Sequence, residues 1–227
     1  MQKAFILIAL LMIPAIVAVE GMGYHHKKKD HEGPKRWSAE TSFYLGPAAG
    51  ECPYADSHFG GSVALDLDSK AARFDTRWNT KGAKAHTIWI FKNEKTINFY
   101  YFDREGGECK THNKTVTDNK MKDHKVELSY KDRYSIGSQM VDFYSFKSGN
   151  YRAMLSITAQ GRLPVRAIGT KANSLLYSVD YLSPHYGFNP FTFELPSECS
   201  SSNATPLNDE GMVLLAEGYY MMHHHDM

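Results

Sequence analysis

The sequence has few cysteines and no surplus of charge of either sign. Three of its 227 residues are Cys, and its 26 basic side chains nearly balance its 25 acidic ones. Proteins that coat nucleic acids depend on clustered positive charge to neutralise phosphates, so this balance argues against such a role. An apolar content of 42% is also too high for a disordered chain. The composition predicts a globular domain that does not bind nucleic acid.

The short motifs of the common enzyme classes are also missing. There is no Gly-x-Ser-x-Gly elbow, no His-Glu-x-x-His, no phosphate-binding glycine loop and no Cys-x-x-Cys. Asp66, Asp68, Asp75 and Asp103 lie near predicted turns, where Asp is common because its side chain hydrogen-bonds to nearby backbone groups. We interpret them as solvated turn residues and expect a protein that is not an enzyme.

One apolar run stands out, and no second run approaches the length of a membrane span. It covers residues 4–17 after the basic Lys3 and ends near the small Ala18, a pattern typical of a signal peptide. We expect a signal peptide over residues 1–18, a secreted protein and no stable membrane span, with a signal anchor as the alternative. In an oxidising compartment, three cysteines leave one thiol unpaired or paired between chains.

Polar segments flank the predicted domain on both sides. We expect a flexible arm rich in His and Lys over residues 19–45, a β domain over 46–199, and a flexible tail over 200–227 with a short apolar patch and a His cluster. The clustered histidines come without the cysteines or ordered carboxylates of a closed structural metal site. Weak, adventitious metal binding is the interpretation that we favour for them.

Between the flanking segments, apolar and polar residues alternate in short runs, which is the signature of half-buried strands. No convincing amphipathic helix separates the runs, so we predict an all-β fold that closes into a sandwich, barrel or half-barrel. The predicted strands are Val63–Leu67, Arg73–Trp78, Thr87–Phe91, Thr96–Phe102, Gln139–Lys147, Arg152–Ala159, Leu163–Ile168, Leu175–Leu182 and Phe191–Leu195.

Aromatic residues make up 13% of the chain, enough for either a large core or the lining of a ligand cavity. Core filling is the simpler interpretation for any single residue, and a ligand-holding interior is the functional one. The candidate lining residues are Leu65, Leu67, Trp78, Ile88, Ile90, Phe99, Tyr101, Phe143, Leu155, Ile157, Val165, Tyr177 and Val179. Asn113 and Asn203 each begin an Asn-x-Thr sequon, so we expect both to carry glycans in a secreted chain.

Six short elements resemble, in the same order, those of the ependymin family. They are Glu51-Cys52-Pro53 followed by Gly60-Gly61; Asp66 or Asp68 with Arg73 and Arg77; Tyr100–Asp103 leading to Cys109-Lys110; Tyr134–Gly137 before the strand Val141–Phe146; Leu163-Pro164-Val165; and Phe193–Cys199. Together they cover about residues 50 to 199. The chain therefore resembles an ependymin-related secreted glycoprotein.

The resemblance implies two stacked antiparallel sheets that form a curved sandwich or half-barrel with an internal hydrophobic pocket. It also implies a disulfide between Cys109 and Cys199. The family has a further cysteine where this chain has Arg162, so Cys52 loses its expected partner. Proteins of this family are commonly dimeric, are not known as enzymes, and are implicated in lipid binding and in calcium-dependent association with extracellular matrix.

Two functions are therefore expected at this point. The first is binding of a lipid, such as a fatty acid, or of another apolar small molecule inside the β domain. The alternative is an extracellular matrix or signalling glycoprotein that acts through its surface. Calcium is a candidate ligand through acids such as Asp66, Asp68 and Asp103, although no spaced calcium-loop motif supports it.

Overall fold

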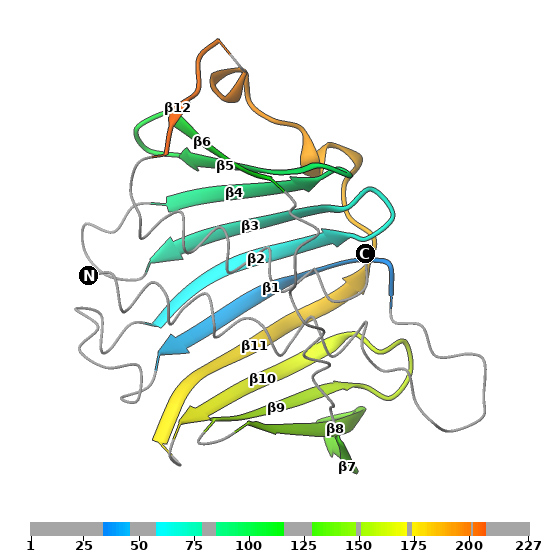
Figure 1. Cartoon of the computed structure of the whole chain (residues 1–227). Coiled ribbons are helices and arrows are strands. Elements are labelled where there is room, and N and C mark those ends of the chain that lie inside the picture. The colour runs from blue at the N-terminus through cyan, green and yellow to red at the C-terminus, as the bar shows by residue number, and fades with distance from the viewer. Residues whose placement is uncertain are drawn as a thin grey trace.

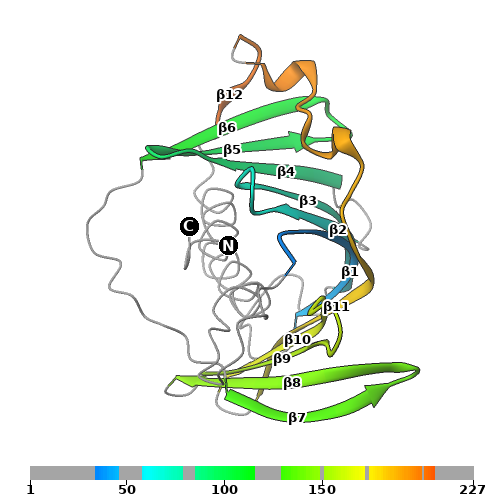
Figure 2. The ribbon, with the colours of Figure 1, turned by 90° about the vertical axis from the view of Figure 1, so that its right-hand side faces the viewer.

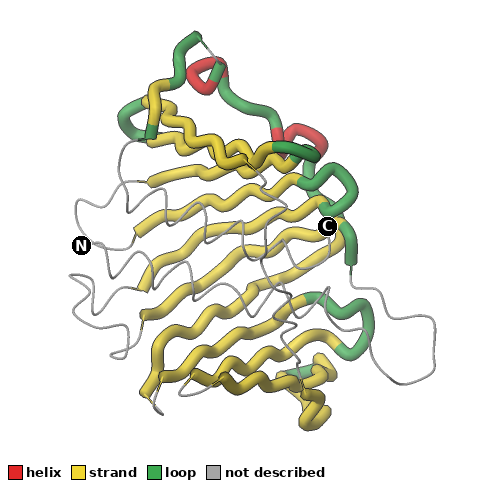
Figure 3. The backbone as a smooth tube through the Cα atoms, viewed as in Figure 1, coloured by secondary structure: helices red, strands yellow, loops and turns green. Residues whose placement is uncertain are grey.

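The computed structural model describes residues 34–45, 58–78, 85–115, 129–148, 151–171, 174–200 and 202–207. These residues form twelve strands and two short 3₁₀ helices (Figures 1 and 3). The strands are β1 (Arg36–Leu45), β2 (His58–Asp66), β3 (Ala71–Trp78), β4 (Ala85–Lys92), β5 (Thr96–Asp103), β6 (Glu108–Thr115), β7 (Ser129–Ile136), β8 (Gln139–Ser148), β9 (Tyr151–Thr158), β10 (Pro164–Lys171), β11 (Ser174–Tyr186) and β12 (Thr205–Pro206). The helices are η2 (Pro190–Phe193) and η3 (Ser197–Cys199).

All twelve strands belong to one sheet, in the order β12-β6-β5-β4-β3-β2-β1-β11-β10-β9-β8-β7. Two meanders, β1 to β6 and β7 to β11, join in the middle because β1 pairs with both β2 and β11. Neighbouring strands are antiparallel except for β12, which runs parallel to β6. The all-β prediction is confirmed, but the described strands form a single sheet where two separate stacked sheets were expected.

The sheet is strongly curved, so that its two ends turn toward the same side (Figure 2). Strand twist alone produces part of this coiling. The β1–β11, β10–β11, β9–β10 and β7–β8 pairs also contain register shifts, and such bulges bend the strands in which they occur. The sheet therefore has a concave and a convex face, as a half-barrel has.

Residues paired directly across antiparallel strands lie on the same face, so the register assigns each side chain to a face. One row runs through Trp37, Leu65, Ala72, Ile90 and Phe99, and every member is buried. The alternate residues of these strands lie on the convex face. That face carries η2 and η3, which contact β3 and β6 (Figure 2).

Two boundaries of the predicted domain are corrected by the sheet. Arg36–Leu45, expected in the flexible arm, forms β1 at the junction of the two meanders. Thr205 and Pro206, expected in the flexible tail, pair with β6 as β12, and the neighbouring Leu207 is buried. The expected signal peptide and the rest of both flanking segments lie outside the described residues. Within the described part of the chain, no helix has the length and apolar character that crossing a membrane requires.

The other predicted strands are present in the structure, although their first and last residues differ from the predicted ones. One predicted strand is absent from the described residues. Residues 191–195 do not form a strand, because η2 begins at Pro190 and the Asn189 side chain accepts a hydrogen bond from the Phe191 N–H. Strands β6 and β7 were not predicted. All eight residues of β7 are exposed, as befits the end of the sheet.

Candidate functional site: the concave apolar face

The concave face carries a continuous layer of apolar side chains that crosses both meanders. Aromatic and branched aliphatic residues dominate it, and an Ala stands at several positions between them. Its buried members are Trp37, Ala39, Phe43, Val63, Leu65, Ala72, Phe74, Ile88, Ile90, Ile97, Phe99, Tyr144, Ala153, Leu155, Ile157, Ala167, Val179 and Tyr181. In the described part of the chain, both helices lie on the opposite face, so no described helix or second sheet packs on this layer.

Most of the residues expected to line a ligand site belong to this layer. Those on the concave face are Leu65, Ile88, Ile90, Phe99, Tyr101, Leu155, Ile157 and Val179. Val165 lies at the register shift between β9 and β10. Trp78 and Tyr177 belong to β3 and β11, and their side chains lie outside the described part of the structure.

Two of the expected lining residues lie elsewhere. Phe143 pairs with Ser156 and is on the convex face, since the concave positions of β8 are those of Asp142 and Tyr144. Leu67 follows the end of β2 and belongs to the turn, where its N–H donates to the Lys35 carbonyl. The predicted alternation extended β2 by one residue, to Leu67, and it assigned Phe143 of β8 to the wrong face of the sheet.

Several concave residues, including Trp37, Phe43 and Tyr181, were not predicted from the sequence. Trp37 and Phe43 were overlooked because β1 was assigned to the flexible arm. The alternation of Trp37, Ala39, Thr41 and Phe43 was the signal that could have identified this strand. The Trp37 and Tyr181 rings meet edge to face, with centroids 6.0 Å apart, and join β1 to β11 on this face.

Polar groups occur near the two ends of the curved sheet on the same face. On the β4–β5 side, the Tyr101 hydroxyl lies 2.6 Å from the His86 Nδ1, and Asp103 is buried at the position paired with His86. On the β7–β8 side, Arg133 donates two hydrogen bonds to the buried Asp142 carboxylate, at 2.6 and 3.1 Å. The hydrogen bond and the charge of Asp142 raise the pKa of Arg133, so the guanidinium stays charged.

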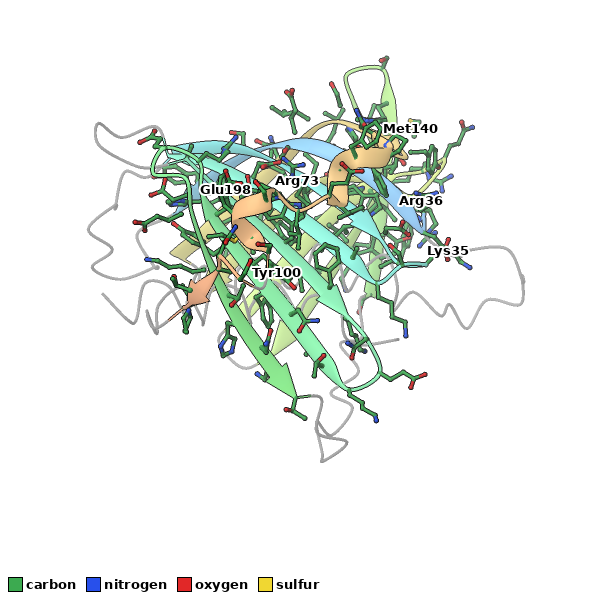
Figure 4. All side chains as sticks on the ribbon, turned by 90° about the horizontal axis from the view of Figure 1, so that it is seen from above. Lys35, Arg36, Arg73, Tyr100, Met140 and Glu198 are labelled. Carbon is green, nitrogen blue, oxygen red and sulfur yellow. A yellow bond between two sulfur atoms is a disulfide. The ribbon has the colours of Figure 1, made fainter. Side chains whose placement is uncertain are left out.

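The convex face has a second apolar cluster, and the chain covers that cluster itself. Residues 187–200 and 202–207, which we call the C-terminal segment, run over strands β3 to β6. The cluster is built from Trp89, Cys109 and Cys199, with Phe91, Tyr100, Phe102, Phe193, Leu195 and Ala204 packed against it. In Figure 4, Arg73 and Tyr100 lie beside the ribbon of this segment, which carries Glu198.

A covalent bond and a polar network hold the C-terminal segment down. Cys109 and Cys199 form a disulfide with a Cα–Cα distance of 5.1 Å, as the family resemblance implied. Arg73 donates to the Thr192 carbonyl at 2.9 Å, and Trp89 donates to the same oxygen at 3.3 Å. Arg73 also lies over the Trp89 ring at 5.3 Å and donates twice to Asp75. The segment is therefore fixed to the sheet at several points.

The acidic residues considered for calcium binding are not clustered. Asp66 ends β2 and Asp103 ends β5, and these strands run in opposite directions, so the two carboxylates lie at opposite ends of the sheet. Each is buried and accepts hydrogen bonds from the N–H groups of the turn that follows it. Their local hydrogen bonding was predicted, but their burial was not. Asp75 lies within β3 and not at a turn. No group of three potential metal ligands occurs among the described residues.

The remaining expected sites divide between described and undescribed parts of the chain. Asn113 is exposed near the end of β6, and Asn203 is exposed in the turn before β12, where its amide donates to the Ser197 carbonyl at 3.1 Å. Both expected glycosylation sites thus lie at the β6–β12 edge of the sheet. Cys52 lies outside the described residues.

Comparisons with known proteins bear on the fold alone. No protein-family model and no curated protein matches the sequence. The structure is similar to that of an uncharacterized conserved protein from Thermus thermophilus, with a TM-score of 0.51 and 10% sequence identity over 73% of this chain and 88% of that one. A weaker likeness to PNGF-II, with a TM-score of 0.38 and 8% identity, covers 82% of this chain and 33% of that protein. The class that the fold defines is an all-β protein built on one curved sheet.

Proposed function

We propose that this chain is a secreted, non-enzymatic glycoprotein related to the ependymin family, and that it binds a lipid or another apolar small molecule against its concave face. The observation that carries the proposal is the continuous apolar layer on that face. In the described part of the chain, both helices lie on the other side of the sheet. Burial of apolar ligand surface against such a layer contributes about 25 cal/mol per Å².

The finer architecture belongs to the same proposal. The two ends of the curved sheet serve as the facing layers of the family fold, and the ligand pocket lies between them. The hydrogen-bonded pair of His86 and Tyr101 offers a polar contact near one end of the apolar layer. An amphipathic ligand would place its hydrocarbon portion on the apolar layer and its polar group near such a pair.

Native mass spectrometry tests this proposal with the protein refolded in the presence of a panel of fatty acids. We expect the wild-type chain to retain at least one of them. Two alanines provide a matched pair of variants: Ala72 is buried on the concave face, and Ala64, on the neighbouring strand, is buried on the convex face. Ala72→Leu should lower retention, and Ala64→Leu should not.

Circular dichroism spectra would establish that both variants fold, since an added side chain in a packed layer costs about 1–3 kcal/mol. A folded wild-type chain that retains no fatty acid or other apolar ligand would contradict the proposal. Equal loss of retention in both variants would show that the concave face is not the binding surface.

The alternative, a glycoprotein that acts through its surface, is favoured by strand β7. Its eight residues are all exposed, and it occupies one end of the sheet. Exposed edge strands are common sites of pairing with another chain. Pull-down from extracellular extract, with and without a calcium chelator, would distinguish this function from ligand binding. Specific, chelator-sensitive capture of matrix components by a ligand-free protein would favour the alternative.

A further inference from the structure

One end of the sheet combines exposed apolar side chains with an excess of basic residues. Antiparallel strands alternate in direction, so the start of β1, the end of β11 and every second strand connection meet at this end. We call it the β1-entry end; it comprises residues 34–36, 66–71, 92–96, 136–140, 158–164 and 186–193. It lies on the right of Figure 1.

The apolar part of this end is unusually exposed. Phe191 is 65% exposed and Tyr186 is 59% exposed, the highest values among the exposed large hydrophobic residues of the described chain. Met140 and Ile136, which flank the β7–β8 turn, are exposed at the same end. Aromatic rings held in water at such exposure are typical of a surface that meets an apolar partner.

The charge at this end is positive. Its basic residues are Lys35, Arg36, Lys70, Lys92, Lys95 and Arg162, and its acidic residues among the strand connections are Asp66, Asp68 and Glu94. Lys35 forms an ion pair with Asp68 at 3.8 Å and Arg36 with Asp66 at 3.3 Å, so the excess positive charge comes from the other basic residues. The β5–β6 connection at the opposite end has the reverse composition, with Asp103, Glu105 and Glu108 around the single Arg104. Lys131 and Arg152 lie at other strand ends on that side, so the acidic excess is confined to the β5–β6 connection.

Local contacts hold the aromatic side chains in place at the β1-entry end. The Phe188 ring packs against Phe193, with centroids 4.9 Å apart, and lies 5.0 Å from the Arg36 guanidinium. The Tyr186 hydroxyl lies so close to Gly161 that a Cβ added to this glycine would overlap it. Phe191 projects from η2, whose first turn is capped by Asn189. Local contacts therefore hold in place the segments that carry the exposed rings.

From this combination we infer that the β1-entry end docks onto an anionic lipid surface. Amphipathic rings such as that of Tyr favour the interface between headgroups and hydrocarbon. Lys and Arg are attracted to anionic headgroups by about 1 kcal/mol each near the surface. The acidic β5–β6 connection at the opposite end would be repelled by the same surface. The inference goes beyond the proposed function and holds whether or not the concave face binds a ligand.

Vesicle co-sedimentation of the full chain tests the inference. One set of vesicles is phosphatidylcholine alone, and the other is phosphatidylcholine with phosphatidylserine. We expect binding to the second set that weakens as salt is raised, because exposed charges are screened. Phe191→Ser with Tyr186→Ser should lower the apparent affinity about tenfold or more, since each ring loses its apolar contact with the bilayer.

Tyr44→Ser is the matched control. Tyr44 is exposed at the opposite end of β1, so its removal should leave vesicle binding unchanged. Lys35→Gln with Lys70→Gln should weaken binding to the anionic vesicles only. Near-UV circular dichroism would verify folding, and Phe191→Ser alone replaces the double variant if Tyr186 proves necessary for folding.

Three results would overturn the inference. The first is a wild-type chain that does not bind anionic vesicles, even if it captures an acidic protein. The second is undiminished binding by the folded Phe191→Ser variant, which would assign any vesicle binding to the basic residues alone. The third is an equal loss of binding in the Tyr44→Ser control.

Discussion

Both faces of this sheet carry apolar residues, but the described helices pack on the convex face alone. On the convex side, the cluster around Trp89 is covered by the C-terminal segment, which a disulfide and several hydrogen bonds fix in place. On the concave side, a larger apolar layer extends across both meanders, and no described helix or second sheet packs on it. Described residues cover the convex cluster, and the concave layer, whose side chains are also buried, is the face that we propose for a ligand.

Polar groups strengthen this contrast. On the convex face, Asp75 accepts hydrogen bonds from Ser62, Thr87 and Arg73. Arg73 also donates a hydrogen bond to the C-terminal segment. A charged group so satisfied fixes one arrangement of the elements around it. On the concave face, the polar pairs stand near the ends of the apolar layer and leave its centre apolar. The first pattern suits a fixed cover, and the second suits an amphipathic ligand.

Loss of the disulfide should have the largest effect on the convex face. We expect Cys109→Ser with Cys199→Ser to lower the free energy of unfolding by about 2–5 kcal/mol, because the unfolded chain loses a constraint on a long loop. Urea unfolding followed by Trp fluorescence would measure it. Cys52→Ser is the control, and it should leave stability unchanged because the Cys109–Cys199 bond does not involve Cys52. Equal stability of the double variant and the wild type would show that the covalent bond adds nothing to the cover.

Asp75→Ala should have the next largest effect. The substitution removes a carboxylate that accepts from three side chains and leaves partly buried donors unsatisfied, so we expect a loss of about 2–4 kcal/mol. Thermal unfolding would measure the loss, and hydrogen exchange should show that the C-terminal segment opens more readily. Unchanged exchange in that segment would mean that Asp75 does not help to hold it.

The contrast between the faces could be predicted only in part from the sequence. Alternation identified strands such as Val63–Leu67 and Arg73–Trp78, and apolar residues on both faces identified Thr87–Phe91. It failed where sheet position determines the pattern: β7 is an edge strand with charged residues and a bulge, and β6 has Lys and His on alternate positions. Such strands lack an apolar alternation and are recognised only by their pairing with the neighbouring strands β8 and β5.

Two further features depended on tertiary contacts. Residues 191–195 alternate like a strand, but they lie between Pro190 and Pro196, and Phe193 and Leu195 pack onto a sheet that the rest of the chain forms. The curvature that creates the concave face comes from strand twist and from bulges, neither of which has a clear sequence signal here. The Cys109–Cys199 pairing came from the family resemblance and not from the spacing of three cysteines.

Tyr101→Phe should have a smaller effect, on the concave face. It removes the hydroxyl that lies 2.6 Å from His86, so we expect a loss of about 0.5–1.5 kcal/mol in unfolding free energy. If the pair contacts a polar ligand group, affinity for fatty acids should fall, whereas affinity for a hydrocarbon probe of similar length should not. An equal fall for both probes would contradict a polar contact at this position.

Arg166→Gln should have the smallest effect, about 0–1 kcal/mol, because its ion pair with Asp180 is largely solvent-exposed. The hydrogen bond to Asp180 raises the pKa of Arg166. A raised pKa adds stability that is fully present below the ordinary pKa of arginine and is lost only as the pH rises through the raised value. The difference between wild type and variant should therefore stay constant from neutral to mildly alkaline pH, and a marked change over that range would contradict this assignment.

The most direct test of the concave-face proposal is paramagnetic broadening of methyl signals by a spin-labelled fatty acid. Ile88, Ile90, Leu155 and Ile157 lie on the concave face, and Val141, Ile168 and Leu195 lie on the convex side of the sheet. The account predicts that the probe broadens the concave set at concentrations that leave the convex set unchanged. Broadening of the convex set, or of neither set, would contradict it.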